Sequence, residues 1–122
     1  MSFQPSKSTV KDATLVEFLY SDIKPDVQCV PGIGPAIAEF LSQAGIQNTF
    51  MLIAKFLELK TNDRDVVAHC NAFFEWLGEI GIKSNRQNIT KSIAEKMSIS
   101  FPTIYAESFF MELDESIAEM SC

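Results

Sequence analysis

The sequence predicts an all-α fold, a compact domain of five to six helices that contains a helix-hairpin-helix. Apolar residues recur at helical spacing through most of the 122 residues, and no stretch shows the strict alternation of a half-buried strand. The third observation is the run Val-Pro-Gly-Ile-Gly-Pro-Ala-Ile over residues 30–37, which precedes an amphipathic stretch. Two glycines followed by a proline are typical of a tight turn that opens directly into a helix.

The first half of the chain is expected to hold a helix over residues 8–21, a short helix around 27–30 and a second hairpin helix ending at Gly45. Residues 49–60 follow, and nearly all of their side chains are apolar. A helix that is apolar almost all round must be buried on more than one side. In so small a domain, we expect the second side to be the interface of a homodimer or of another protein partner. The residues predicted for this interface are Phe50, Leu52, Ile53, Phe56 and Leu57.

In the second half, Asn62 is the expected cap of a helix that runs to Gly78, and the spacing of Ser84 and Gln87 resembles a capping box. After residue 97, apolar residues recur at every fourth position and the outer face is acidic. The sequence therefore predicts a helical domain over residues 1–97, with the hairpin at about 27–45. An acidic amphipathic helical extension is predicted over residues 98–122.

The charge is unevenly distributed along the chain. The 10 bases and 16 acids give a net charge of −6, and five of the acids lie in residues 101–122, which contain no Lys or Arg. Residues 1–100 thus hold 10 bases against 11 acids. Such a near-neutral domain can bind phosphates locally, but it lacks the broad basic patch that usually steers DNA. No apolar stretch approaches the roughly 18 residues of a membrane span, so no membrane insertion is expected.

The cysteine and histidine content points away from metal and redox chemistry. The three cysteines are odd in number and lack metal-ligand spacing, which favours reduced thiols in the nucleus or cytoplasm. The single histidine, His69, is interpreted as a helix-surface residue. We find no nucleophile–base pair, metal cluster or nucleotide loop in the sequence, so no catalytic residue, metal or cofactor is predicted and the protein is expected not to be an enzyme.

The hairpin itself is a candidate anion site. The first N–H groups of a helix have no intrahelical partner and carry the positive end of the helix dipole, so they bind anions without a basic side chain. Alternatively, the two glycines only build a sharp turn between core helices. The residues predicted to bind DNA at the hairpin are Gly32, Ile33, Gly34, Ala36 and Ile37.

From about Phe18 to Lys96, the sequence resembles the barrier-to-autointegration factor family of small chromatin and nuclear-envelope proteins. The resemblance depends on the order of several short motifs at nearly the family's spacings. These are Lys24-Pro25 and Val27, Gly32-Ile33-Gly34, Leu41, Gly45-Ile46, Phe56-Leu57-Glu58-Leu59-Lys60, Glu75-Trp76-Leu77, and Lys83 with Arg86.

The resemblance implies a helical homodimer that binds and bridges double-stranded DNA without reading its sequence, with nuclear-envelope or chromatin proteins as partners. It implies phosphate contacts from the hairpin amides and from the side chains of Lys83, Ser84 and Arg86. An arginine near the start of a helix can bind phosphate with two parallel hydrogen bonds. The alternative for Lys83 and Arg86 is a solvated helix start without a ligand.

The chain also departs from the family. Glu39-Phe40 stands where the family has two lysines, Thr14 stands where it has another, and the segment 60–75 is about seven residues longer. Each lost phosphate contact lowers DNA affinity. A second hypothesis is therefore a dimeric protein-interaction module that has lost DNA binding.

Overall fold

The computed structural model describes residues 2–105, and this part of the chain contains helices and no strand, which confirms the all-α prediction. The five α-helices are accompanied by two short 3-10 helices, η1 and η2. In chain order the elements are η1 (Pro5–Lys7), α1 (Asp12–Tyr20), η2 (Val27–Cys29), α2 (Pro35–Gln43), α3 (Thr49–Glu58), α4 (Val66–Glu79) and α5 (Arg86–Ser100).

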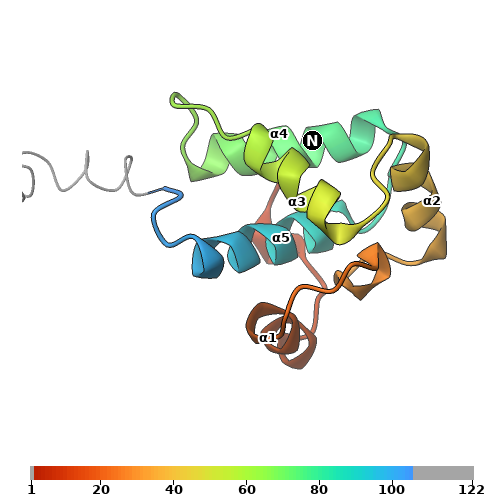
Figure 1. Cartoon of the computed structure of the whole chain (residues 1–122). Coiled ribbons are helices and arrows are strands. Elements are labelled where there is room, and N and C mark those ends of the chain that lie inside the picture. The colour runs from red at the N-terminus through yellow and green to blue at the C-terminus, as the bar shows by residue number, and fades with distance from the viewer. Residues whose placement is uncertain (1, 106–122) are drawn as a thin grey trace, which may run out of the picture.

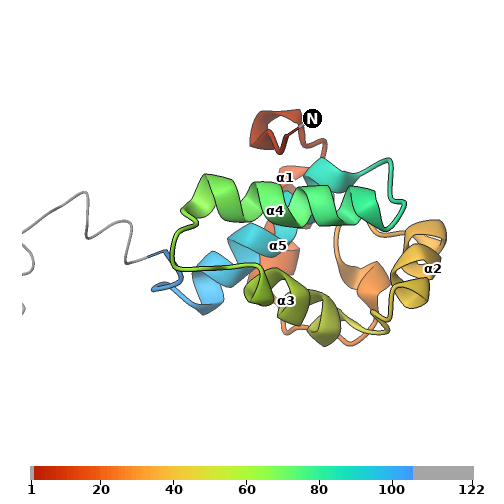
Figure 2. The same cartoon turned by 90° about the horizontal axis from the view of Figure 1, so that it is seen from above.

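The helices α4 and α5 lie side by side and run in opposite directions (Figures 1 and 2). Helix α1 packs against α5, and α3 covers another side of the same pair. The hairpin formed by η2 and α2 lies at one end of the domain, and residues 101–105 lie at the opposite end in both views. A single apolar core joins these elements. Its fully buried members include Leu41, Leu52, Phe56, Phe73, Leu77, Ile89 and Ile93.

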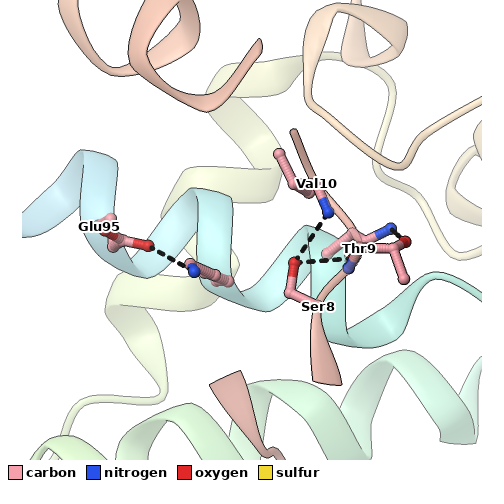
Figure 3. A network of polar contacts seen from close by, with 6 residues as sticks. Ser8, Thr9, Val10 and Glu95 are labelled. Carbon is pink, nitrogen blue, oxygen red and sulfur yellow. Dashed lines mark hydrogen bonds and ion pairs between the residues drawn. The ribbon is translucent and has the colours of Figure 1, made fainter. Parts of the chain in front are cut away.

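The segment before α1 is tied to α5 by side-chain hydrogen bonds. The buried Asn88 side chain accepts from the Ser8 hydroxyl (2.8 Å) and from the Thr9 N–H (2.7 Å) through its Oδ1, while its Nδ2 donates to Thr9 Oγ1 (3.1 Å). Figure 3 shows Ser8 and Thr9 beside α5, with the Val10 N–H donating to Ser8 Oγ (3.3 Å). The N-terminal segment therefore belongs to the folded domain.

A lysine from α5 caps the C-terminal end of α1. The ammonium of Lys96, only 4% exposed, donates to the carbonyls of Phe18 (2.9 Å), Leu19 (2.9 Å) and Ser21 (2.5 Å). The last carbonyls of a helix have no intrahelical donor, and a cation there is favoured by the helix dipole. Lys96 thus replaces the missing donors and fixes α1 to the core.

Several predicted boundaries are wrong. Helix α1 begins at Asp12 rather than near residue 8, because residues 8–11 are extended against α5. Helix α4 is capped by Asp65, whose side chain accepts from the Ala68 N–H (2.9 Å), and not by Asn62. No capping box forms at Ser84, since the α5 cap is the next residue and Gln87 accepts from the Gln4 N–H instead.

The structure describes only the beginning of the predicted C-terminal extension. Helix α5 continues to Ser100, and residues 102–105 form a turn. The remainder of the predicted helical extension over 98–122 lies outside the described residues.

His69, expected on a helix surface, is completely buried.

Candidate nucleic-acid interface

The hairpin turn explains why the sequence needs Pro31 and Gly32. The Ile33 N–H donates to the Val30 carbonyl (3.0 Å), and Gly32 at the third position has φ 96°, which favours glycine. A Cβ atom on Gly32 would lie 3.0 Å from Asn88 Cβ, so the turn also packs tightly on the first turn of α5. Because its side chain is buried and its N–H is bonded within the turn, Ile33 is not available to a ligand, and its predicted role in DNA binding is corrected.

The turn leads directly into the start of α2. Gly34 is the N-cap residue in an extended conformation, Pro35 follows, and no side chain among the described residues caps this end. A Cβ added to Gly34 meets nothing within 4 Å, so the space in front of the helix is open. Within residues 2–105, the N–H groups of Ala36 and Ile37 have no hydrogen-bond acceptor. These two N–H groups are therefore free to bind a ligand, although the Ile37 side chain is buried in the core.

A second uncapped helix start lies beside the first. Asn85, the N-cap residue of α5, adopts a left-handed conformation (φ 62°), and its Nδ2 donates to the Gly32 carbonyl (3.2 Å). No side chain of the described part caps α5 either. Asparagine tolerates this conformation better than most residues do, and this was the signal that sequence reasoning missed. Asn85 therefore holds the starts of α2 and α5 together.

The three side chains predicted near the start of α5 behave differently. Lys83 and Ser84 are exposed. Arg86 turns back onto α4: its guanidinium carbon lies 4.2 Å from the centre of the Phe74 ring, and Nη1 donates to the Phe74 carbonyl (3.3 Å). The Arg86 side chain is partly exposed and packs on α4 in this structure, and its phosphate contact stays a prediction.

A groove with a volume of about 550 Å³ runs between α1, η2 and the hairpin turn. Three charged side chains line it: Glu17, Asp22 and Lys24. Gly32 and Gly34 lie on its wall together with Asn85. The hairpin is therefore accessible from this side, but it lies in a mixed electrostatic environment with more acids than bases.

The positions that depart from the family lie on α2. Glu39 is exposed, and its carboxylate accepts from Gln43 Nε2 (3.3 Å). Phe40 is partly exposed and rests against the loop after α4, because a Cβ on Gly81 would lie 3.0 Å from its ring. Phe40 accordingly has a packing partner within the chain, whereas Glu39 only adds negative charge to the surface.

Most of the predicted protein interface lies in the core of the chain itself. Leu52, Ile53 and Phe56 are buried among the other helices, so the prediction that they contact a partner is wrong. The other helices of the same chain bury more of α3 than we expected from its apolar composition. Leu57 is half-buried and packs on the core, and Phe50 is 52% exposed. The open surface of α3 is apolar over its first half, where Phe50, Met51 and Ala54 are exposed, and charged near its end, where Glu58 is exposed.

Among residues 2–105, no cluster of three His, Cys, Asp or Glu side chains is arranged to hold a metal ion. None of the described helices combines the length and apolar character needed to cross a membrane. Comparisons of the chain with protein-family models, curated proteins and solved structures find no match.

Proposed function

We propose that this protein binds double-stranded DNA through its phosphates, without reading the base sequence. The observation that carries the proposal is the pair of uncapped helix starts, α2 and α5, held together by the hydrogen bond from Asn85 to the Gly32 carbonyl. Free N–H groups at a helix start bind phosphate oxygens, and the dipole of each helix favours negative charge at its own start. Phosphate contacts position a protein on the duplex without giving sequence specificity.

The resemblance to the barrier-to-autointegration factor family supports the same proposal, and it adds the idea of a homodimer that bridges two duplexes in chromatin or at the nuclear envelope. Two exposed lysines lie beside the helix starts: Lys24 on the groove and Lys83 just before α5. The acids Glu17, Asp22 and Glu39 oppose them. We therefore propose weak binding in which backbone amides contribute much of the affinity.

The test compares two substitutions of one residue. An added side chain at Gly34 meets open space, and φ at this residue is −101°, which other residues also adopt, so Gly34→Asp and Gly34→Asn both fit the backbone. Both side chains can cap α2, but only the aspartate places a negative charge where a phosphate would bind. In fluorescence anisotropy with two unrelated duplexes at low salt, Gly34→Asp is expected to weaken binding about ten-fold or more relative to Gly34→Asn.

The two duplexes should respond equally, because the proposed contacts are to phosphates. Circular dichroism should show that both variants keep their helices. Equal DNA affinity for Gly34→Asp and Gly34→Asn would contradict the proposal and leave the hairpin with a structural role alone.

A second candidate function is a protein-interaction module that forms a dimer and does not bind DNA. It is favoured by the apolar surface of α3, where Phe50 is 52% and Met51 40% exposed. Phe50→Glu is expected to convert a dimer into a monomer in light scattering, while circular dichroism stays unchanged. A wild-type protein that is monomeric at micromolar concentration would rule out this module and the bridging dimer together.

A further inference from the structure

The N-terminal strap, residues 3–9, lies against the first turn of α5. Asn88 in this turn is only 9% exposed, and its side chain is hydrogen-bonded to the strap. Its Oδ1 accepts from the Ser8 hydroxyl (2.8 Å) and from the Thr9 N–H (2.7 Å), and its Nδ2 donates to Thr9 Oγ1 (3.1 Å) (Figure 3). The strap therefore satisfies both polar atoms of a buried amide on α5.

Backbone groups of the strap also bind side chains on both helices of the α4–α5 pair. The Gln4 N–H donates to Oε1 of Gln87 (2.8 Å), which lies in the first turn of α5. The Phe3 N–H donates to Asn71 Oδ1 (2.9 Å) on α4, and the Phe3 ring centre lies 6.4 Å from that of Phe74. The strap is thus anchored on α4 at one end and on α5 at the other.

The first turn of α5 depends on such contacts because the helix start lacks a cap. An N-cap side chain ordinarily accepts from the free N–H groups of the first turn, and helix ends without one fray more readily. The N-cap residue Asn85 instead uses its side chain to donate to the Gly32 carbonyl (3.2 Å). Among residues 2–105, the N–H groups of Gln87 and Asn88 have no hydrogen-bond acceptor. The strap therefore holds this turn by its side chains and leaves its N–H groups open.

The first turn of α5 is also packed directly against the hairpin. A Cβ on Gly32 would lie 3.0 Å from Asn88 Cβ and 3.2 Å from Ile89 Cγ1, so no gap separates the hairpin turn from α5. The hydrogen bond from Asn85 to the Gly32 carbonyl joins the same two segments. Close-packed groups transmit displacements, and α2 begins directly after the hairpin turn, at Pro35. The positions of both helix starts therefore depend on the first turn of α5.

We propose that the N-terminal strap is a positioning element of the DNA site and that it acts through Asn88. The strap takes the place of a helix cap on α5, so the first turn stays ordered while its N–H groups remain open to phosphate. Asn88 is a positioning residue, since its buried side chain binds the strap. The ligand is that of the proposed function, on which this inference rests.

The first test measures amide hydrogen exchange by NMR in the full-length chain, without DNA. The Ile89 N–H is bonded in the first turn of α5 (3.0 Å) and the Ile33 N–H in the hairpin turn (3.0 Å), while the His69 N–H is bonded at the start of α4 (2.9 Å). In Asn88→Ala, exchange of the Ile89 and Ile33 amides should accelerate about ten-fold more than exchange of the His69 amide. Asn62→Ala is the matched control and should leave all of these rates unchanged, because Asn62 is exposed in the loop before α4.

The second test measures duplex affinity by fluorescence anisotropy at low salt. Asn88→Ala should weaken binding about five-fold relative to Asn62→Ala, and the slope of log K against log salt should stay the same, because no cation is removed. From the side of the strap, Thr9→Val removes the oxygen that accepts from Asn88 Nδ2, whereas Thr9→Ser keeps it. Thr9 is exposed, so both variants are expected to fold, and of the two only Thr9→Val should weaken binding.

Equal acceleration of the Ile89, Ile33 and His69 amides in Asn88→Ala, or no acceleration, would overturn the positioning role whether or not the protein binds DNA. If the wild type binds duplex and Asn88→Ala binds it equally well, this inference fails while the proposed function stands. If the wild type binds no duplex, the proposed function fails and this inference fails with it. A slope that falls by about one unit in Asn88→Ala would also overturn the inference, because the exposed Lys7 of the strap would then be a phosphate contact itself.

Discussion

Replacing Lys96 with methionine is expected to disconnect the end of α1 from α5. The lysine is 4% exposed, and its ammonium donates to three carbonyls of α1 and the residue that follows it. Methionine keeps an unbranched side chain of similar length, so the apolar part of the contact is retained. The substitution therefore removes three hydrogen bonds and one charge while leaving no large cavity.

The expected loss of stability can be worked out from these contacts. A hydrogen bond to a charged group contributes about 1.5–3 kcal/mol net. The bonds to Phe18 and Ser21 are partly buried, so water can replace the ammonium there, whereas the bond to the Leu19 carbonyl is buried. Leaving one buried acceptor without a donor costs about 1–3 kcal/mol, and the partly compensated pair adds a smaller amount. We expect Lys96→Met to lower the free energy of unfolding by about 3 kcal/mol.

Urea unfolding followed by circular dichroism measures this change. Lys91→Met is the matched control on the same helix, because the Lys91 ammonium lies 4.0 Å from the Glu95 carboxylate (the contact drawn at Glu95 in Figure 3) and pairs near the surface. Such a pair contributes about 0–1 kcal/mol. If both variants lose less than about 0.5 kcal/mol, the reasoning that Lys96 replaces the missing donors of α1 is refuted.

Three further expectations concern other parts of the fold. Glu39→Lys should raise duplex affinity at low salt and steepen the plot of log K against log salt by about one unit, whereas Glu39→Gln should leave the slope of the wild type unchanged. Equal slopes for Glu39→Lys and Glu39→Gln would show that this part of α2 does not contact phosphate. Gly32→Ala should lower the free energy of unfolding by about 1–3 kcal/mol in thermal melts, because φ is 96° and the added Cβ lies 3.0 Å from Asn88 Cβ. Gly34→Ala should lower it less, because the added Cβ meets open space. Burial lowers the pKa of His69 in the folded protein below 6.5, so the unfolded chain binds the proton more readily than the folded chain does. The free energy of unfolding should therefore fall as the pH drops from 6.5 through the pKa of His69 in the folded protein. Equal midpoints of urea unfolding at pH 7.5 and pH 5.5 would contradict this.

The hairpin could be predicted from the sequence because its information is local. Pro31 and Gly32 specify the turn by their own backbone preferences, and within a helix Pro35 is accommodated in the first turn. The same holds for α3, which the apolar residues predict over 49–60 and which the structure shows at Thr49–Glu58, two residues shorter at its end. Patterns that depend on neighbours a few residues away are readable before the fold is known.

The features that the sequence did not predict depend on contacts between distant segments. The sequence position of Arg86 does not show that the packing of α5 on α4 brings it over Phe74. His69 occupies an apolar stripe without any local sign that Phe56 and Tyr105 would satisfy both of its nitrogens. The composition of α3 shows that two sides are apolar, but it does not say how much of them one domain can cover. In each case the missing information is tertiary.

The balance between backbone amides and basic side chains decides how DNA binding would respond to salt. The slope of log K against log salt counts the phosphates neutralised by lysine and arginine, at about 0.9 for each. With Arg86 packed on α4, the exposed lysines beside the helix starts are Lys24 and Lys83. Two such contacts for each protomer give a slope of about −2 and a loss of roughly ten-fold between 50 and 200 mM salt. A slope of −6 or steeper per protomer would require a basic surface elsewhere and would remove the hairpin from the centre of the proposed interface.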